Sequence, residues 1–308
     1  MNDTWKPDPV FHHFPSRTSA LILQLLVTSL GIITNSLLFY AHLKDPYKIL
    51  RRSSSHFIIN LAIIDFLASC TLFAFSVLRF DVVSLRIAHT LTVGLHWFLA
   101  VCTTASVSSF LCLAVERFIS IAHPLWYRVN ITKQVYRYWI GILWLVVVSF
   151  EAIQRAFYYN YLLTFGFVRV GFLLTGFLAA NLLYLASYIS VKRQRRDVCA
   201  RSTLSESNKQ AIQARLKNEK SFLSTIAIVC FIFALTFLPL LLFMFHLHMV
   251  EIGQSVGYLN DVVESFETWI IAVISLNFTV NAFIYVWRWP KYRNTFKKLY
   301  CNKYICNS

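Results

Sequence analysis

Long apolar runs, separated by short polar segments, dominate the order of residues along the chain. Seven runs reach the length of about 20 residues that an α-helix needs to cross a bilayer. They cover residues 19–42, 56–79, 88–121, 137–157, 162–191, 219–248 and 259–287. The pattern predicts an all-α membrane protein built as a bundle of seven transmembrane helices, with both termini on opposite sides of the membrane.

Composition supports the same class of protein. Of the 308 residues, 57% are hydrophobic and 14% are charged. In a soluble domain of this size, about a quarter of all residues are charged. This chain is too apolar to keep its whole surface in water, so we expect much of that surface to face lipid.

The charges are distributed unevenly between the two sides of the predicted membrane. The segments after the first, third and fifth runs, together with the C-terminal tail, carry 22 of the 29 Lys and Arg residues and four acidic residues. The other side carries six basic and eight acidic residues, and only Asp65, Glu116 and Arg117 are assigned to the spans. By the positive-inside rule, the N-terminus is predicted to be extracellular and the C-terminus cytoplasmic. The formal charge of +15 therefore indicates basic cytoplasmic loops rather than a nucleic-acid partner.

The spans divide the chain into three parts. Residues 1–18 form an extracellular N-terminal tail without the apolar core of a signal peptide. This tail holds an N-glycosylation sequon at Asn2. Residues 19–287 form the seven-transmembrane domain, and residues 288–308 form a cytoplasmic helix and tail.

The segment after the seventh run has the pattern of a short amphipathic helix. Its aromatic and apolar residues recur at helical spacing among basic residues, at Trp289, Tyr292, Phe296 and Leu299. Such a helix lies on the anionic inner leaflet, in contact with membrane lipids. Cys301 and Cys306 are palmitoylation candidates, and inert cytosolic thiols are an equal alternative for both.

Ionisable side chains inside a span are costly unless they find partners, so they mark functional candidates. Asp65 lies in the middle of the second run, and polar Ser106, Asn277 and Asn281 occur in the third and seventh. These residues form either a satisfied polar knot that holds helices together or a functional site.

A second feature is the stretch SFLCLAVERFISIAHPLWYR, where Glu116 and Arg117 stand side by side as an apolar run ends. Together with other motifs, this stretch resembles the rhodopsin-like (class A) family of G-protein-coupled receptors. The motifs occur in order on the expected spans: NLAIID in the second, ERF in the third, TFLP in the sixth and NAFIY in the seventh. Asn35 and Trp144 fill the landmark positions of the first and fourth spans.

The resemblance covers about residues 19–301 and is greatest to the adenosine, melanocortin and lipid receptor branch. Three departures stand out. No cysteine is available for the usual extracellular disulfide, Ala282 replaces the usual proline of the seventh span, and Gly176 stands where a proline is common in the fifth.

The resemblance implies a charged activation switch at the cytoplasmic end of the third span. Glu116 and Glu219 would hold Arg117 in the inactive state, and outward movement of the sixth span would free it for the G protein. The other switch and coupling residues that the resemblance implies are Leu125, Tyr184, Tyr285, Phe237 and Pro239. The alternative for Glu219 is a solvated acid at a helix start. For the HPLWY segment the alternative is an interfacial aromatic anchor.

The resemblance also implies an allosteric sodium ion. Its ligands would be Asp65, Ser106, Asn277 and Asn281, which match the sodium pocket of the family. Bound sodium would favour the inactive state, because it selects the conformation that assembles all its ligands. No other cofactor is expected.

The sequence excludes several classes of extracellular ligand but identifies none. Leu99 stands where amine receptors have an aspartate, Ser275 where opsins have the retinal lysine, and Met244 where adenosine receptors have an asparagine. The predicted pocket is apolar and aromatic with polar groups at its rim, and its candidate residues are Phe75, His96, Leu99, Met244 and Glu267. A small lipid or a peptide would suit it.

The sequence therefore predicts a multi-pass plasma-membrane receptor that signals through heterotrimeric G proteins. The first alternative is a non-signalling seven-helix scaffold or heterodimer partner, and a transporter stands behind it. No metal-spaced His/Cys cluster, phosphate loop or nucleophile elbow indicates an enzyme.

Overall fold

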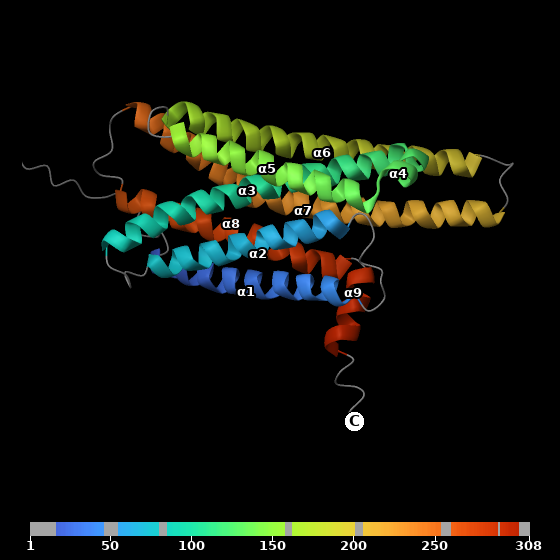
Figure 1. Ribbon diagram of the computed structural model, residues 1–308, viewed down its shortest axis with the longest axis horizontal. Helices are drawn as coiled ribbons and strands as arrows, with labels where there is room; N and C mark the ends of the chain where they lie inside the picture. The colour runs from blue at the N-terminus through green and yellow to red at the C-terminus, as the bar shows by residue number, and fades with distance from the viewer. Residues whose placement is uncertain are drawn as a thin grey trace, which may run out of the picture.

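The computed structural model describes residues 17–45, 55–79, 85–157, 162–200, 206–253, 260–288 and 290–301. In these ranges all the regular structure is helical, and the long helices run roughly parallel along one axis (Figure 1). The seven membrane-length helices are α1 (Arg17–Lys44), α2 (Ser55–Leu78), α3 (Leu85–Ala122), α5 (Lys133–Phe157), α6 (Leu162–Ala200), α7 (Glu206–Gly253) and α8 (Asn260–Arg288).

Each of the seven helices contains a stretch that is long and apolar enough to cross a membrane. The predicted all-α, seven-span fold is therefore confirmed, with the fourth to seventh spans corresponding to α5, α6, α7 and α8. The prediction placed α1, α2 and α3 within three residues of their observed ends. We call the end of the bundle that carries Arg117 the inner end and the opposite end the outer end.

Two helices extend further than the apolar runs predicted. The sixth and seventh helices, α6 and α7, continue to Ala200 and begin at Glu206, well inside the predicted third inner loop. Their extensions project beyond the rest of the bundle (Figure 1). The added residues are rich in Lys, Arg, Gln, Glu and Ala, which favour helix but carry no hydropathy signal.

A short helix, α4 (Pro124–Asn130), follows α3 after a single residue. Pro124 occupies its first turn, where the missing N–H of proline is tolerated. The helix presents Leu125, Trp126 and Val129 to the surroundings. The HPLWY segment is thus a separate helix beside the inner end of α3.

Helices α1, α2 and α8 pack closely around Gly31. A Cβ atom at this position would lie 2.5 Å from Ser69 Oγ and 2.7 Å from Thr279 Oγ1. Small residues let transmembrane helices approach one another, because association within lipid depends on packing and hydrogen bonds. Thr279 also donates a hydrogen bond to the carbonyl of Val27 at 3.0 Å, which joins α8 to α1.

The C-terminal part of the described chain turns away from the bundle axis. Helix α9 (Pro290–Phe296) and the π-helix η2 (Lys297–Cys301) lie beside the inner end of α1 (Figure 1). Burial of Tyr292 raises the pKa of its hydroxyl, so this tyrosine stays neutral. Tyr300 donates a hydrogen bond to the carbonyl of Leu37 at 3.2 Å, although regular helical spacing had not placed it on the packed face. The wider π-turn changes the register of the last residues.

Candidate functional site

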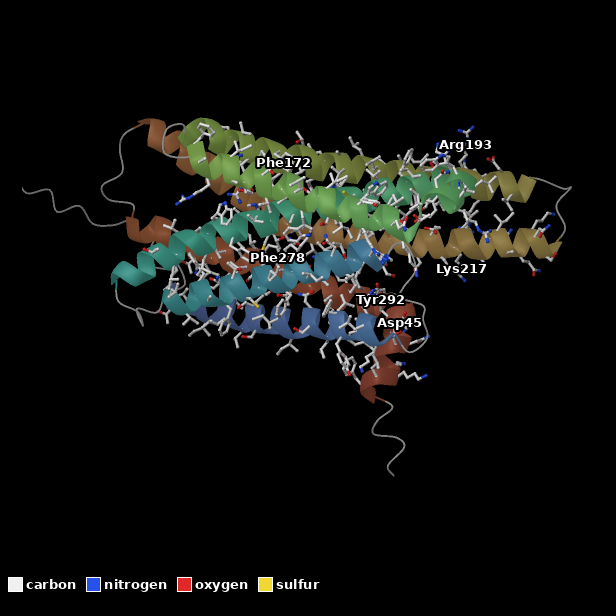
Figure 2. All side chains as sticks on the ribbon, viewed as in Figure 1. Asp45, Phe172, Arg193, Lys217, Phe278 and Tyr292 are labelled. Carbon is white, nitrogen blue, oxygen red and sulfur yellow. The ribbon has the colours of Figure 1, made fainter. Side chains whose placement is uncertain are left out.

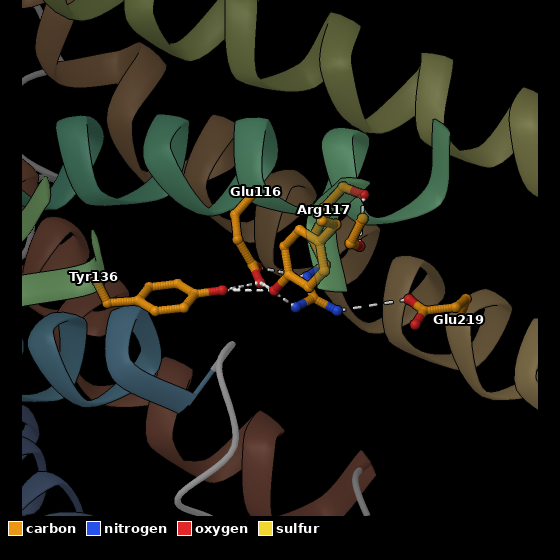
Figure 3. Close-up of polar contacts among 6 residues, drawn as sticks. Glu116, Arg117, Tyr136 and Glu219 are labelled. Carbon is orange, nitrogen blue, oxygen red and sulfur yellow. Dashed lines mark hydrogen bonds and ion pairs between the residues drawn. The ribbon is translucent and has the colours of Figure 1, made fainter. Parts of the chain in front are cut away.

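A buried acid–base pair occupies the inner end of α3. The side chain of Glu116 is 0% exposed, and Arg117 is buried beside it. The guanidinium donates from Nε to Glu116 Oε2 and from Nη2 to Oε1, both at 2.7 Å (Figure 3). Such a bidentate, charge-assisted pair is both strong and geometrically specific.

Two tyrosines complete the surroundings of Glu116. Tyr136 of α5 donates its hydroxyl to Glu116 Oε1 at 2.9 Å, and Tyr127 of α4 donates to the same oxygen. The two hydroxyl oxygens also lie 2.5 Å apart, so one tyrosine can donate to the other while that one donates to Glu116. The ring of Tyr136 is held by His56, with ring centroids 5.2 Å apart. Elements α2, α3, α4 and α5 are thereby linked through one carboxylate.

Glu219 of α7 approaches Arg117 from the other side. Its Oε2 lies 3.6 Å from Arg117 Nη1, which is an ion pair rather than a short hydrogen bond (Figure 3). Glu219 is only half-buried, so this contact is looser than the pair within α3. We call Glu116, Arg117 and Glu219 the inner charge cluster. It is the charged contact between α3 and α7 that the sequence resemblance implies.

Asp65 lies in the centre of the bundle and is fully buried. Asn281 of α8 donates from Nδ2 to Asp65 Oδ2 at 3.0 Å. Asp65 Oδ1 and Asn277 Oδ1 are buried without a hydrogen-bond partner among the described residues. Buried acceptor oxygens without a donor are costly, and a small hard cation is one group that would satisfy them.

The remaining polar residues of this region are only partly brought together. Ser106 is buried on α3, but none of the described hydrogen bonds joins it to Asp65. Asn60, five residues before Asp65, instead donates to Ser109 at 2.9 Å and accepts from Trp144 at 3.0 Å. The structure therefore joins Asp65 directly to Asn281 and uses Asn60 to link α2, α3 and α5.

The other predicted switch residues lie in varied surroundings. Leu125 is 81% exposed at the inner face, whereas Tyr184 and Tyr285 are buried on α6 and α8. Tyr184 donates to the carbonyl of Phe110 at a long 3.5 Å. Helix α7 continues on both sides of Pro239, and α8 runs unbroken through Ala282, where the family usually has proline.

The outer end carries a cluster built around Phe75. The guanidinium of Arg79 lies 4.7 Å from the centre of the Phe75 ring, and the His96 ring meets that ring edge-on at 4.6 Å. Arg79 also donates to Thr268 Oγ1 at 3.0 Å, which joins α2 to α8. Two of the predicted pocket residues, Phe75 and His96, are therefore in contact, and Leu99 is half-buried on the same helix as His96.

Several predicted site residues are not described. Asn2 and Cys306 lie outside the described residues, and the same holds for the side chains of Phe237, Met244, Glu267 and Cys301.

A buried acid in α5 was missed by the sequence analysis. Glu151 is 2% exposed, accepts a hydrogen bond from Thr104 of α3, and lies 3.8 Å from Nε of Arg169 in α6. Both charged residues had been counted with the outer loops, although they fall inside the predicted runs 137–157 and 162–191. The rule that singled out Asp65 should have singled them out too.

The comparisons with known proteins agree with this geometry. Residues 34–160 match the family described as 7 transmembrane receptor (rhodopsin family). Human cannabinoid receptor 2 is 30% identical to the chain over 135 residues, which are 43% of this chain and 36% of the relative. The chain thus spans about a third of the length of this relative. The family match over residues 34–160 includes Asp65, Glu116, Arg117 and Glu151. Both the matched family and the relative are receptors by name, in keeping with the prediction that the chain is no enzyme.

Proposed function

We propose that the chain is a seven-transmembrane receptor of the rhodopsin family, whose model matches residues 34–160, and that it passes an extracellular signal to heterotrimeric G proteins. The observation that carries the proposal is the inner charge cluster. Arg117 lies between Glu116, in its own helix, and Glu219, in α7. Arg117 can therefore give up its looser contact with Glu219 while it keeps the tight contact with Glu116.

The proposed switch is an outward movement of α7. In the arrangement described here, the 3.6 Å contact with Glu219 holds α7 against α3. Movement of α7 would break this contact and open the inner face around Arg117 for the G protein. Exposed Leu125 on α4 would then contact the G protein beside Arg117, while buried Tyr184 and Tyr285 would repack within the bundle. Phe237 and Pro239 are the further switch residues that the resemblance implies.

Sodium bound in the middle of the bundle would shift the equilibrium between the inactive and active arrangements of the helices. The buried, unpartnered oxygens Asp65 Oδ1 and Asn277 Oδ1 are chemically suited to it, and Ser106 and Asn281 would complete the ligand set. A sodium ion held there would neutralise the Asp65 carboxylate and favour the conformation that gathers these oxygens.

The proposed setting is the plasma membrane, with the N-terminus outside and the basic inner loops in the cytoplasm. Two kinds of ligand suit the apolar outer pocket, a small lipid and a peptide. The relative is by its name a receptor for cannabinoids, and we take a small lipid as the first candidate ligand. The contacts of Phe75 with Arg79 and His96 give such a pocket an aromatic wall with basic groups beside it.

A non-signalling scaffold or heterodimer partner is the second candidate. The unbroken α8 through Ala282 favours it, because the family's usual proline is absent from the helix that carries Asn281 and Tyr285. The intact inner charge cluster and the exposed Leu125 favour the signalling receptor.

Ligand-free G-protein activation in cells separates the two. Wild type, Arg117→Ala and Glu219→Ala are compared at equal surface expression across the main G-protein families. The receptor proposal requires that wild type or the Glu219 variant activates a G protein without ligand. It also requires that the Arg117 variant does not. Silence of all three with every G protein would contradict the proposal and favour the scaffold.

A further inference from the structure

A second charged cluster lies between α3, α5 and α6 in the outer half of the bundle. Its centre is the carboxylate of Glu151, which accepts a hydrogen bond from the Thr104 hydroxyl. The backbone carbonyl of Glu151 accepts another from Trp97 Nε1 at 3.4 Å. The carboxylate itself is buried and has two partners, the Thr104 hydroxyl and the Nε of Arg169.

Arg169 is the accessible member of the cluster. Its Nε lies 3.8 Å from Glu151 Oε1, and its side chain is 35% exposed. A guanidinium has five N–H donors in a planar fork. Among the described residues its Nη groups have no hydrogen-bond or ion-pair partner, so Glu151 orients the guanidinium through Nε while the Nη donors stay available.

Gln154 adds a second donor. It lies one turn beyond Glu151 on α5 and is more than nine-tenths buried, yet its Nε2 has no partner among the described residues. An orphaned buried donor is costly unless an acceptor arrives. The unsatisfied groups of the cluster are therefore donors, which excludes a cationic ligand group and favours an anionic one.

The net charge of this region points the same way. In the described outer halves of α5 and α6, the charged residues are Arg155, Arg169 and Glu151. The surplus positive charge stands out because the predicted outer side of the chain carries more acids than bases.

Apolar surface adjoins the charged group. One turn from Arg169, the ring of Phe172 stacks on Phe150 of α5, with ring centroids 4.8 Å apart. Figure 2 labels Phe172 near the outer end of α6. Ile153 and Val168 on either side are about half exposed, as expected of residues that face lipid. Arg169 lies about 10 Å along α6 from the start of this helix, where an arginine needs polar or anionic partners, and Glu151 contacts only its Nε.

From these contacts we propose that Arg169 and Gln154 bind the anionic headgroup of a single-chain lipid, a carboxylate or a phosphate, whose tail lies along Phe150 and Phe172. Glu151 is a positioning residue that holds the guanidinium fork open. This names the ligand class of the proposed receptor and rests on the proposed function for its signalling consequence, but not for binding itself.

Binding is measured without a G protein. The full-length protein is reconstituted in nanodiscs of neutral phosphatidylcholine and titrated with radiolabelled oleate, oleyl alcohol and oleoyl lysophosphatidate. Removing Arg169 alone would leave Glu151 as an uncompensated buried charge and could unfold the protein. The main variant is therefore the double change Glu151→Gln and Arg169→Gln, which removes both charges, and Arg169→Lys is the second variant.

The matched control is Arg193→Gln, which removes one positive charge from the same helix about 36 Å further along its axis. Figure 2 labels Arg193 toward the inner end of α6. A charge-assisted bidentate contact is worth enough to change affinity roughly tenfold or more. We expect oleate or the lysophosphatidate to bind wild type and the Arg193 variant equally, roughly tenfold more weakly to the double variant, and with intermediate affinity to Arg169→Lys. Oleyl alcohol is expected to bind all four weakly.

Equal binding of the anionic probes by wild type and the double variant would overturn the proposal, and so would equal binding of oleate and oleyl alcohol by wild type. Loss of oleate binding when phosphatidylglycerol is added to the nanodiscs would show a general phospholipid contact and would also overturn it. Basal G-protein activation that depends on Arg117, without any binding of these probes, would refute this site and leave the receptor function standing. Binding through Arg169 without any G-protein activation would support this site and contradict the proposed receptor function.

Discussion

Neutralising Glu219 is the perturbation that most directly probes the contact between α3 and α7. The change Glu219→Gln keeps the size and shape of the side chain and removes its charge. At the observed 3.6 Å from Arg117 Nη1, two unit charges attract by about 5 kcal/mol at an effective dielectric constant near 20 and by about 1 kcal/mol in bulk water. Glu219 is half-buried and has to be desolvated on pairing, so we expect a net contribution of about 1 kcal/mol.

Loss of about 1 kcal/mol from the inactive arrangement shifts the two-state equilibrium about fivefold toward the active one. The assay is ligand-free G-protein activation in cells at matched surface expression. The control is Asp197→Asn, which neutralises an exposed acid near the inner end of α6. We expect basal activation to rise about fivefold in Glu219→Gln and to stay unchanged in the control. An unchanged or lowered basal signal in Glu219→Gln would refute the role of this contact.

Three further predictions follow from the other sites. Asp65→Asn should abolish the suppression of basal signalling by sodium that wild type is expected to show, because the ion loses its only carboxylate ligand; sodium suppression that survives in this variant would contradict the site. Tyr136→Phe removes the 2.9 Å hydrogen bond to Glu116 and keeps the ring contacts, so it should destabilise the purified protein by about 1.5–3 kcal/mol, as read from thermal unfolding, whereas exposed Tyr138→Phe should not. Leu125→Ala should lower the rate of G-protein activation without changing the unfolding temperature, because this side chain has no buried packing to lose; a lowered unfolding temperature would show that Leu125 is structural.

The helices could be located from the sequence wherever their residues are apolar. Apolar runs located the first three spans closely because the lipid-crossing length dominates their composition. The same criterion ended α6 early and began α7 late, because polar helix formers such as those of residues 206–218 continue a helix into water without an apolar signal.

The partners of the predicted site residues were harder to foresee. The ERF motif indicated the Glu116–Arg117 pair, but it gave no sign that Tyr136, 20 residues away in another helix, donates to the same carboxylate. The alternative for the segment that contains Tyr127 was an aromatic anchor at the membrane interface. In the structure, the Tyr127 hydroxyl donates a hydrogen bond to Glu116. Such contacts depend on how helices rotate about their axes, which a single sequence specifies only weakly.

Glu151 and Arg169 are a different case, because the information was present in the sequence. Both fall within runs that are long enough to cross the membrane. Glu151 lies about two turns after the landmark Trp144, and Arg169 lies about two turns after the start of α6. Grouping them with the loop charges hid an acid and a base that the structure places 3.8 Å apart between α5 and α6.

The central claim is that α7 moves away from α3 when a G protein binds. The direct measurement is the distance between two spin labels, one replacing Lys220 on α7 and one replacing Tyr138 on α5, both exposed positions near the inner end. It is recorded for the purified receptor alone and with the G protein that shows the highest basal activation. The account predicts a longer distance in the complex, and a partial shift toward that distance in Glu219→Gln without the G protein. A distance that stays the same when the G protein is bound would contradict the account.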